Sequence, residues 1–362
     1  MAMNKKTVLT GVIIAVLAVA TIVIAILLQG KVSLEKPTTN TGMGMGTVIV
    51  ESFYCKDESV SADAIKYCTD TIDDLDYNRL SWRKKSSEIY NVNTNGSGYV
   101  DKATYDCLRT CMDVSKNSNG RFDSTVGNLS GLWNITTEND PNAYLPTEKE
   151  IKEAMGTVGY DRLNLSAAEG LYKVEIAKGQ KIDLGAVGKG LACDVIHDYL
   201  KDTSIVGGTV SVGGSILVYG KNPTKDNGTW NIGVRDPISG SDNSYMAILN
   251  CGECCISTSG DYEKFFYQGG KKYHHILDPM TGYPAESNIT SVTIIADSGI
   301  ITDALSTACF ILGYCDDSLA LIEKYDAEAI FIKKDKTVYI TDGIKDNVTI
   351  TNDEFKLGAE VA

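Results

Sequence analysis

The stretch IDLGAVGKGLACD, Ile182 to Asp194, has the order of a strand, a glycine-rich turn and the start of a helix. Glycines stand at positions 185, 188 and 190, and Lys189 lies where the predicted helix begins. Backbone amides at a helix start, close approach at glycine and a lysine charge suit a phosphate group. The spacing matches neither a Walker loop nor the dinucleotide fingerprint, so a tight strand-to-helix turn without a ligand is the alternative.

The sequence on both sides of this stretch mixes strands and helices without regular alternation. Strands are expected over 47–52, 172–176, 181–184, 210–219, 230–235 and 291–296, helices over 61–80, 104–116, 147–156, 189–201, 301–312 and 316–325, and a hairpin over 329–340. This order predicts an α+β fold rather than a doubly wound sheet.

Paired glycines, Gly213 and Gly214, interrupt the strand pattern from Val210 to Gly220. They remove side chains where a flat ligand or another backbone must approach, or they mark a β-bulge.

The segment from Cys255 to Pro284 concentrates hydroxyls, acids, glycines and two of the three histidines of the chain. Such a composition is typical of a site rather than of a core. His274 and His275 lie in a predicted strand and therefore point to opposite faces, so that one of them can face a site. His197, on the helix after the glycine-rich turn, is expected to be packed or on the surface.

Asp303 and Thr307 are one helical turn apart in the sequence TDALSTA. Their oxygens therefore share a face and form a partial site for a hard cation such as Mg²⁺. The alternative is a capping aspartate and a threonine bonded within its own helix.

The N-terminal residues form a separate unit. Lys5 and Lys6 precede an apolar run over residues 8–28, which is long enough to cross a bilayer as a helix. The lysines favour a cytoplasmic N-terminus and a single-pass protein of the cell membrane with an extracytoplasmic body, although a cleaved signal segment is the rival interpretation. Residues 1–30 are thus a membrane anchor or signal segment and 31–44 a flexible linker, and the folded body is expected to begin near Met45.

Composition limits the partners and the role of the cysteines. A net charge of −13 disfavours nucleic acid as a partner. The ten cysteines include a single CxxC, at 251–254, so zinc binding through paired motifs is not indicated. They are expected to be mostly buried small residues, with a disulfide or redox chemistry as the alternatives.

Taken in order, these motifs resemble those of the ApbE family, the FAD:protein FMN transferases or flavin transferases. The resemblance covers almost the whole body and includes the following residues and motifs: Met45 to Thr47, Ser87, Glu88, Asn91, Phe122, Asp123, Thr125 to Gly127, Leu129, Trp133, DLGAVGKGLACD, SVGGS, Ile232 to Pro237, TSGDY, HILDP, TGYP and DALSTA. It implies a single large ApbE-like, T-fold-related α+β catalytic domain over residues 45–357, behind the N-terminal transmembrane helix.

The resemblance also implies a reaction and a set of residues. Family members bind FAD and Mg²⁺, break the pyrophosphate and transfer FMN to a threonine or serine hydroxyl of an acceptor flavoprotein, leaving AMP; some relatives hydrolyse FAD instead. The implied metal ligands are Asp303, Thr307 and the carbonyl of Ala186, and the implied catalytic residues are His275 as the base and Lys189. The implied flavin and adenine contacts are Met45, Thr47, Gly185, Lys189, Asp194, Gly213, Gly214, Ser259, Gly260, Asp261 and Asp278.

Two expectations are less direct. Trp82, or Arg83 beside it, takes the place of an aromatic residue that stacks on the flavin in relatives. His275 is expected to titrate near its ordinary pKa of about 6.5, which suits a base, and His274 is expected to be exposed. The competing functions are a FAD pyrophosphatase and a flavin-binding surface protein without turnover.

Overall fold

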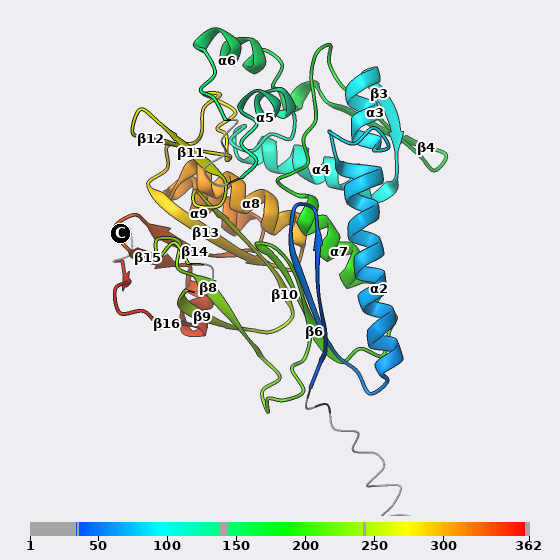
Figure 1. Ribbon diagram of the computed structural model, residues 1–362, viewed down its shortest axis with the longest axis vertical. Helices are drawn as coiled ribbons and strands as arrows, with labels where there is room; N and C mark the ends of the chain where they lie inside the picture. Colours follow the sequence, from blue (N-terminus) through cyan, green and yellow to red (C-terminus); the bar gives the residue numbers. More distant parts are fainter. Residues whose placement is uncertain (1–33, 35, 138–142, 242–243, 359–362) are drawn as a thin grey trace, which may run out of the picture.

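A nine-stranded sheet forms the centre of the structure (Figure 1). The computed structural model describes residues 34, 36–137, 143–241 and 244–358. The strand order of the sheet is β1-β2-β6-β7-β10-β13-β14-β15-β17, and its neighbours are antiparallel except for the parallel pair β15 and β17. The α+β class expected from the sequence is confirmed.

The elements of the chain have the following bounds. The strands of the central sheet are β1 Thr38–Gly44, β2 Thr47–Tyr54, β6 Gly207–Val212, β7 Ser215–Gly220, β10 Cys254–Gly260, β13 Ile289–Ala296, β14 Glu328–Lys333, β15 Thr337–Ile340 and β17 Lys356–Leu357. The smaller sheets contain β3 Ser97–Val100, β4 Asn164–Ala168 and β5 Leu171–Glu175; β8 Trp230–Arg235, β9 Tyr245–Cys251 and β16 Val348–Ile350; and β11 Phe265–Gln268 with β12 Lys271–His274. The helices are α2 Glu58–Asp74, α3 Glu88–Asn95, α4 Lys102–Asn117, α5 Gly127–Trp133, α6 Glu148–Met155, α7 Gly188–Leu200, α8 Gly299–Leu312 and α9 Asp316–Lys324, with a π-helical turn at Leu75–Leu80 and 3₁₀ turns at Tyr160–Arg162 and Asp342–Asn347.

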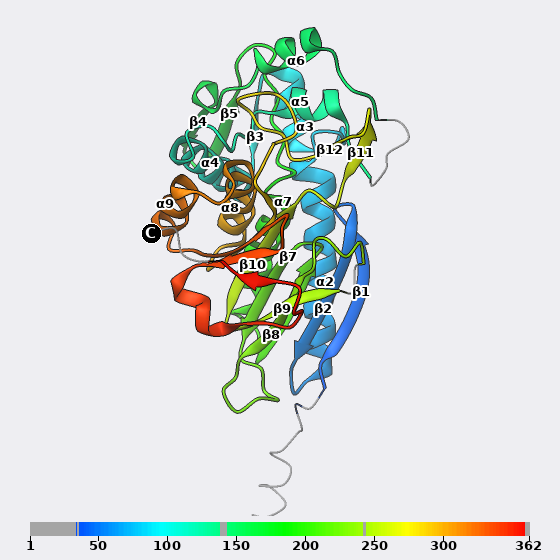
Figure 2. The ribbon, with the colours of Figure 1, turned by 90° about the vertical axis from the view of Figure 1, so that its left-hand side faces the viewer.

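The two faces of the sheet are covered by different layers. Helices α2, α7 and α8 contact one face, and the sheet of β8, β9 and β16 packs on the other (Figures 1 and 2). Successive strand residues point to opposite faces. Leu217 therefore belongs to the core cluster under the helices and its neighbour Val218 to the second cluster. Each face thus has its own apolar core.

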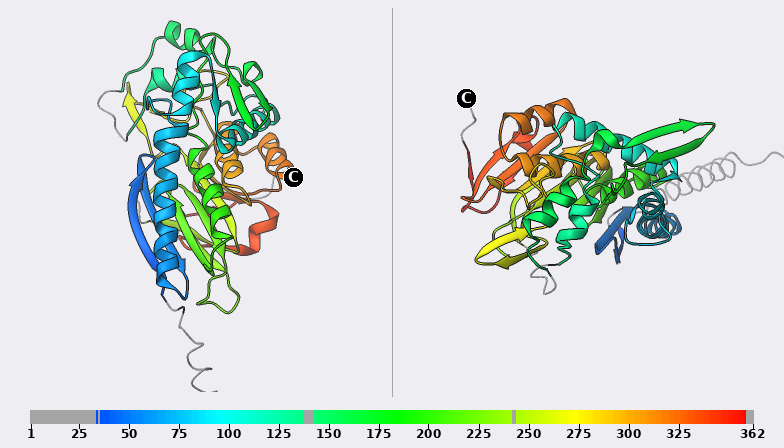
Figure 3. Two further views of the ribbon diagram at one scale, coloured as in Figure 1. Left: turned by 90° about the vertical axis from the view of Figure 1, so that its right-hand side faces the viewer. Right: turned by 90° about the horizontal axis from the view of Figure 1, so that it is seen from above.

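A third layer lies beyond the end of the sheet, where α5, α6 and the hairpin of β11 and β12 come together (Figure 3). Trp133, Phe266 and Tyr273 are buried in its apolar cluster, in which the Tyr273 ring stacks on both other rings. The indole Nε1 of Trp133 donates to the carbonyl of Gly282 at 2.8 Å. This layer fixes the segment from β11 to the turn at Gly282, which carries His275.

Three sequence expectations about local structure are wrong. The predicted linker 31–44 ends earlier, because Thr38–Gly44 pair with β2 as strand β1. The predicted strand 181–184 forms only an isolated bridge, between Lys181 and Val126, since no neighbouring strand continues the ladder. The predicted strand 210–219 is a hairpin, in which Val212 pairs with Ser215 across Gly213 and Gly214. Gly213 has a φ of 59°, so its lack of a side chain permits the tight turn.

The predicted membrane anchor over residues 8–28 lies outside the described residues. In the described ranges, no helix combines the length and the apolar character that crossing a membrane requires.

Candidate active site

A cleft with two joined chambers lies where the glycine-rich turn before α7 meets the ends of β7 and β10. The inner chamber, of about 250 Å³, extends toward Phe122, Trp133, Ile276 and Leu277, and the outer chamber, of about 810 Å³, extends toward Met45, Trp82 and Tyr245. The residues that line both chambers are Arg83, Asp183, Gly185, Lys189, Gly214, Thr258, Glu263 and Lys264. One ligand with two unlike halves can therefore occupy both chambers, with its middle at Lys189.

Helices α7 and α8 cross at two glycines beneath the cleft. A side chain on Gly190 would stand about 2.0 Å from the carbonyl oxygen of Gly299, so only glycine fits at this crossing. The close approach brings the carboxylate of Asp303 to 2.6 Å from the amide of Gly190, and its other oxygen accepts a hydrogen bond from Ser215 Oγ at 2.7 Å. Asp303 is thereby held in one orientation.

Asp303, Thr307 and Ala186 all line the inner chamber. Asp303 is 4% exposed, and no lysine or arginine of the described residues forms an ion pair with it. Its position does not fit the capping alternative, because α8 is capped by Ser298. A buried carboxylate near a hydroxyl and a carbonyl is a donor set suited to Mg²⁺. The described residues contain no group of three or more His, Cys, Asp or Glu side chains suited to a metal, so substrate oxygens would have to complete the shell.

Most backbone amides of the glycine-rich turn already donate hydrogen bonds to oxygens of the protein, whereas a phosphate cradle requires free amides. The amide of Gly185 donates to Asp183 Oδ1 at 2.8 Å, those of Val187 and Gly188 donate to the carbonyl of Leu184, and that of Gly190 donates to Asp303. The expected cradle of turn amides is therefore largely occupied by protein oxygens. Charge for a phosphate would come instead from side chains, namely Lys189, Arg83, which the sequence indicated only as a stacking residue, and Lys264, which the motifs did not indicate.

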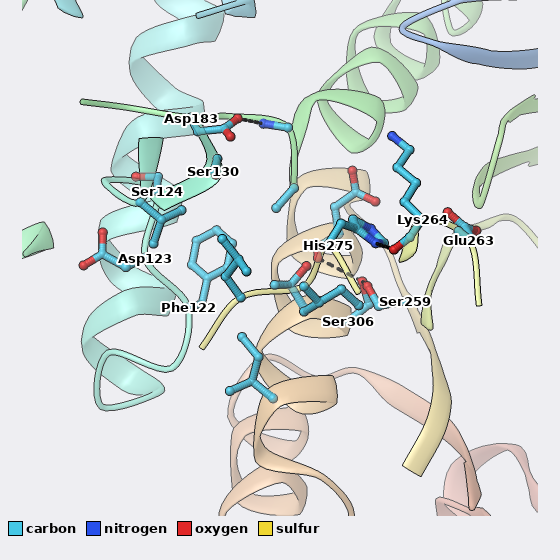
Figure 4. A pocket seen from close by; sticks show the side chains of 18 of the residues that line it. Phe122, Asp123, Ser124, Ser130, Asp183, Ser259, Glu263, Lys264, His275 and Ser306 are labelled. Atoms are coloured by element: carbon cyan, nitrogen blue, oxygen red, sulfur yellow. Dashed lines mark hydrogen bonds between the residues drawn. The ribbon is translucent and has the colours of Figure 1, made fainter. Parts of the chain in front are cut away.

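Lys264 and Arg83 line both chambers, and Figure 4 shows Lys264 beside His275. Burial is the main cause of the lowered pKa of the Lys264 ammonium, and the charge of the nearby Lys189 adds to it. Arg83 lies over the ring of Trp82, with its guanidinium carbon 3.8 Å from the ring centroid. The sequence motifs do not identify Lys264 as a residue of the cleft, because a lysine in a turn-rich segment usually faces solvent. Its place within the segment from Cys255 to Pro284 could have indicated a role in the site.

His275 follows β12 and lines the inner chamber. Its Nδ1 lies 3.3 Å from the carbonyl oxygen of Lys264 (Figure 4). Since a carbonyl can only accept, Nδ1 carries the proton and Nε2 keeps its lone pair. Burial, together with the charge of Lys264, lowers the pKa of His275 to about 3. The expectation of an ordinary pKa near 6.5 is therefore wrong for the protein without substrate.

His274 points away from the cleft and is buried, which contradicts the expectation that it is exposed. Its Nε2 donates to the carbonyl of Ala285 at 3.0 Å, and its Nδ1 accepts from the amide of Ile276. Burial lowers the pKa of this histidine to about 4. The opposite orientation of the two histidines is confirmed.

Most of the predicted contact residues do reach the cleft. The outer chamber is lined by Met45, Thr47, Trp82, Gly185, Lys189, Gly213 and Gly214, and the inner chamber by Gly185, Lys189, Gly214, Ser259 and Gly260. The turn of Met45 and Gly46 has positive φ at both residues and joins β1 to β2 at the edge of the outer chamber.

Three predicted contacts lie elsewhere. Asp194 accepts hydrogen bonds from Ser298 Oγ and the amides of Gly299 and Ile300, so it holds the start of α8. Asp261 forms an ion pair with Lys272 beside a separate hollow. Asp278 forms an ion pair with Arg121 at 3.0 Å, and its carboxylate also accepts from the amide of Met280, so it organises the turn after His275. These acids support the cleft without lining it.

The α+β body carries a two-chambered cleft with a buried acid, a histidine and cations in its lining, an arrangement typical of an enzyme active site. Comparisons with known proteins give the family. The ApbE family model matches residues 45–331. The FAD:protein FMN transferase of Treponema pallidum is 34% identical over 269 residues, and the alignment covers 71% of this chain and 73% of the relative. The FAD:protein FMN transferase of Escherichia coli K12 is 30% identical over 287 residues, and the alignment covers 78% of this chain and 80% of the relative.

Solved structures give the same result. The ApbE protein of Thermotoga maritima has a TM-score of 0.75 at 29% identity, and the flavin transferase ApbE of Vibrio cholerae has a TM-score of 0.73 at 25% identity. Each comparison covers 86% of this chain and 99% of the solved one. The chain belongs to the ApbE family, and it is an enzyme of the transferase class.

Proposed function

We propose that this protein transfers FMN from FAD to a threonine or serine hydroxyl of an acceptor flavoprotein, releases AMP and requires Mg²⁺. The observation that carries the proposal is that Lys189 and Lys264 lie at the junction of the two chambers, while His275 and Asp303 line the inner chamber beside them. Relatives that are at least 30% identical to this chain over the aligned residues are named FAD:protein FMN transferases.

The unequal chambers suggest how FAD is divided. The AMP half fits the smaller inner chamber with its apolar wall, and the FMN half fits the larger outer chamber, where Trp82 and Arg83 offer flat surfaces for stacking. The pyrophosphate then lies beside Lys189 and Lys264, whose ammonium groups offset its charge in a partly buried site.

In the reaction, the acceptor oxygen forms a bond to the FMN-side phosphorus while the bond from that phosphorus to the bridging oxygen breaks and AMP leaves. The proton of the acceptor hydroxyl passes to Nε2 of His275, the nitrogen that keeps a lone pair because Nδ1 donates to the carbonyl of Lys264. A bound pyrophosphate would raise the low pKa of His275 by offsetting the charge of Lys264. His275 is thus a base that becomes effective when the substrate is bound.

Asp303, Thr307 and the carbonyl of Ala186 would hold Mg²⁺ in the inner chamber. When bound, the ion neutralises phosphate charge and stabilises the leaving AMP. Asp303 is kept in place for this role by its hydrogen bonds with Gly190 and Ser215.

For the location, we propose a single-pass protein of the cell membrane that is anchored through residues 8–28 and carries its catalytic domain outside the cytoplasm. The support is the apolar run preceded by Lys5 and Lys6. Its acceptors would then be exported or membrane redox subunits.

An assay with FAD and a flavin-accepting protein, with and without Mg²⁺, tests the proposal. We expect covalent flavin fluorescence on the acceptor in a denaturing gel and AMP release, both lost with EDTA. AMP release without a labelled acceptor would favour a FAD pyrophosphatase. FAD binding without either product would favour a flavin-binding protein and would refute the proposed reaction.

A further inference from the structure

The CxxC pair, Cys251 and Cys254, has no part in the cleft. Cys251 ends β9 and Cys254 begins β10, with only Gly252 and Glu253 between them. The two strands belong to different sheets, so the chain crosses from one sheet to the other at this turn. All ten cysteines are free thiols in the structure.

The turn is held so that the two thiols face each other. Glu253 accepts a hydrogen bond from the amide of Gly220 at 2.6 Å, and its other carboxylate oxygen lies 3.0 Å from Nε2 of His197. The side chains of Cys251 and Cys254 lie close enough across the turn to interact directly. Contact between the sulfur atoms therefore needs little movement of the backbone.

The two thiols differ in character. The interaction with Cys254 and the charge of Lys225 lower the pKa of Cys251, whereas the same interaction and burial raise that of Cys254. Both residues are partly exposed. A second bonded pair, Cys107 and Cys111 on α4, is fully buried and so is not accessible to a reagent.

We propose that Cys251 and Cys254 form a reversible dithiol–disulfide site that exchanges with small-molecule disulfides. The thiolate of Cys251 attacks one sulfur of the small disulfide, whose S–S bond breaks and releases one thiol. The thiol of Cys254 then loses its proton and attacks the sulfur of Cys251, which releases the second thiol. The protein loses two electrons and two protons, and one small disulfide is reduced to two thiols.

Equilibration of the full-length protein with mixtures of reduced and oxidised glutathione tests this. The samples are quenched with acid, alkylated and analysed by peptide mapping. As the share of oxidised glutathione rises, we expect the peptide with Cys251 and Cys254 to lose both alkyl groups in one transition. Its mass should then be about 2 Da, the mass of two hydrogens, below that of the reduced and unalkylated peptide. Cys107 and Cys111 should stay reduced. Full alkylation of Cys251 and Cys254 after equilibration with excess oxidised glutathione would overturn the proposal, as would one glutathione on each.

Single variants separate the two roles, with folding checked by circular dichroism. Cys254→Ser should trap one glutathione on Cys251, because the resolving thiol is missing. Cys251→Ser should leave Cys254 largely unmodified, and equal trapping in both variants would contradict the assigned order of attack. Cys55→Ser is the matched control, since Cys55 is partly exposed and bonded to Ser204 rather than to a thiol, so this variant should retain the disulfide.

Discussion

Replacing Asp194 by alanine tests whether this acid contacts the ligand or supports the helices. In the structure its carboxylate joins α7 to the start of α8 through three hydrogen bonds, at 2.9 Å to Ser298 Oγ, 2.5 Å to the amide of Gly299 and 3.1 Å to that of Ile300. It lines neither chamber of the cleft. We therefore expect Asp194→Ala to lower the free energy of unfolding of the flavin-free protein.

The size of the loss follows from these bonds. A hydrogen bond to a charged group contributes about 1.5–3 kcal/mol, and three would sum to more than about 4.5 kcal/mol. Burial raises the pKa of Asp194, so desolvation of the carboxylate offsets part of this sum. We expect a net loss of about 3–4 kcal/mol. With an unfolding entropy of about 2.1 cal/mol/K per residue over roughly 320 residues, the midpoint of thermal unfolding falls by about 5 °C.

Thermal unfolding followed by circular dichroism without flavin, and FAD titration well below the transition, give the two readouts. Asp198→Ala is the matched control, because Asp198 lies on the same helix but is exposed and pairs only with Lys201. If Asp194→Ala unfolded at the temperature of the control while losing FAD affinity, the supporting role would be refuted and a direct ligand contact favoured.

Four further predictions concern the cleft. Asp303→Asn should lower the rate of Mg²⁺-dependent AMP release by about 100-fold, because one group that stabilises charge is lost. The midpoint of thermal unfolding checks that the variant remains folded. His275→Ala should lower the transfer rate far more than FAD affinity; an unchanged rate of acceptor labelling would show that another group takes the proton. Trp82→Ala should weaken flavin binding by about 3- to 10-fold if stacking contributes about 0.5–1.5 kcal/mol, as checked by fluorescence titration. The pKa of His275 is about 3 in the folded protein and about 6.5 in the unfolded chain, so between these pH values the unfolded state binds the proton more readily and the free energy of unfolding falls as pH drops. His275→Gln should reduce the difference in the free energy of unfolding between pH 7 and pH 4.5, measured by urea unfolding. An identical pH dependence in this variant would argue against the low pKa of His275.

The sequence predicted the residues whose position follows from local periodicity. His274 and His275 had to point apart because they are neighbours near a strand, and Asp303 and Thr307 had to share a helix face because they are four apart. Both arrangements occur in the structure. The burial of His274 away from the cleft could not be predicted, because it depends on Phe310 and Ala285, which pack against His274 from elsewhere in the chain.

Asp194 and Asp278 were predicted to contact the ligand from their motifs, but neither lines the cleft. Asp194 follows Lys189 by five residues, which turns it about 140° around the helix axis, so the two side chains cannot face the same chamber. Periodicity alone could have shown this. Asp278 could not be assigned in the same way, because its partner Arg121 comes from a distant segment and its contacts depend on how two loops meet.

The net charge of the whole chain does not describe the charge inside the cleft. The chain carries a net charge of −13, yet Arg83, Lys189 and Lys264 meet at the junction of the chambers. Charges separated by more than about 10 Å are largely screened at 0.1 M salt, so a bound pyrophosphate interacts mainly with this local group. In the proposed reaction we therefore expect the local charges at the junction, rather than the sum over the chain, to decide whether the pyrophosphate of FAD binds.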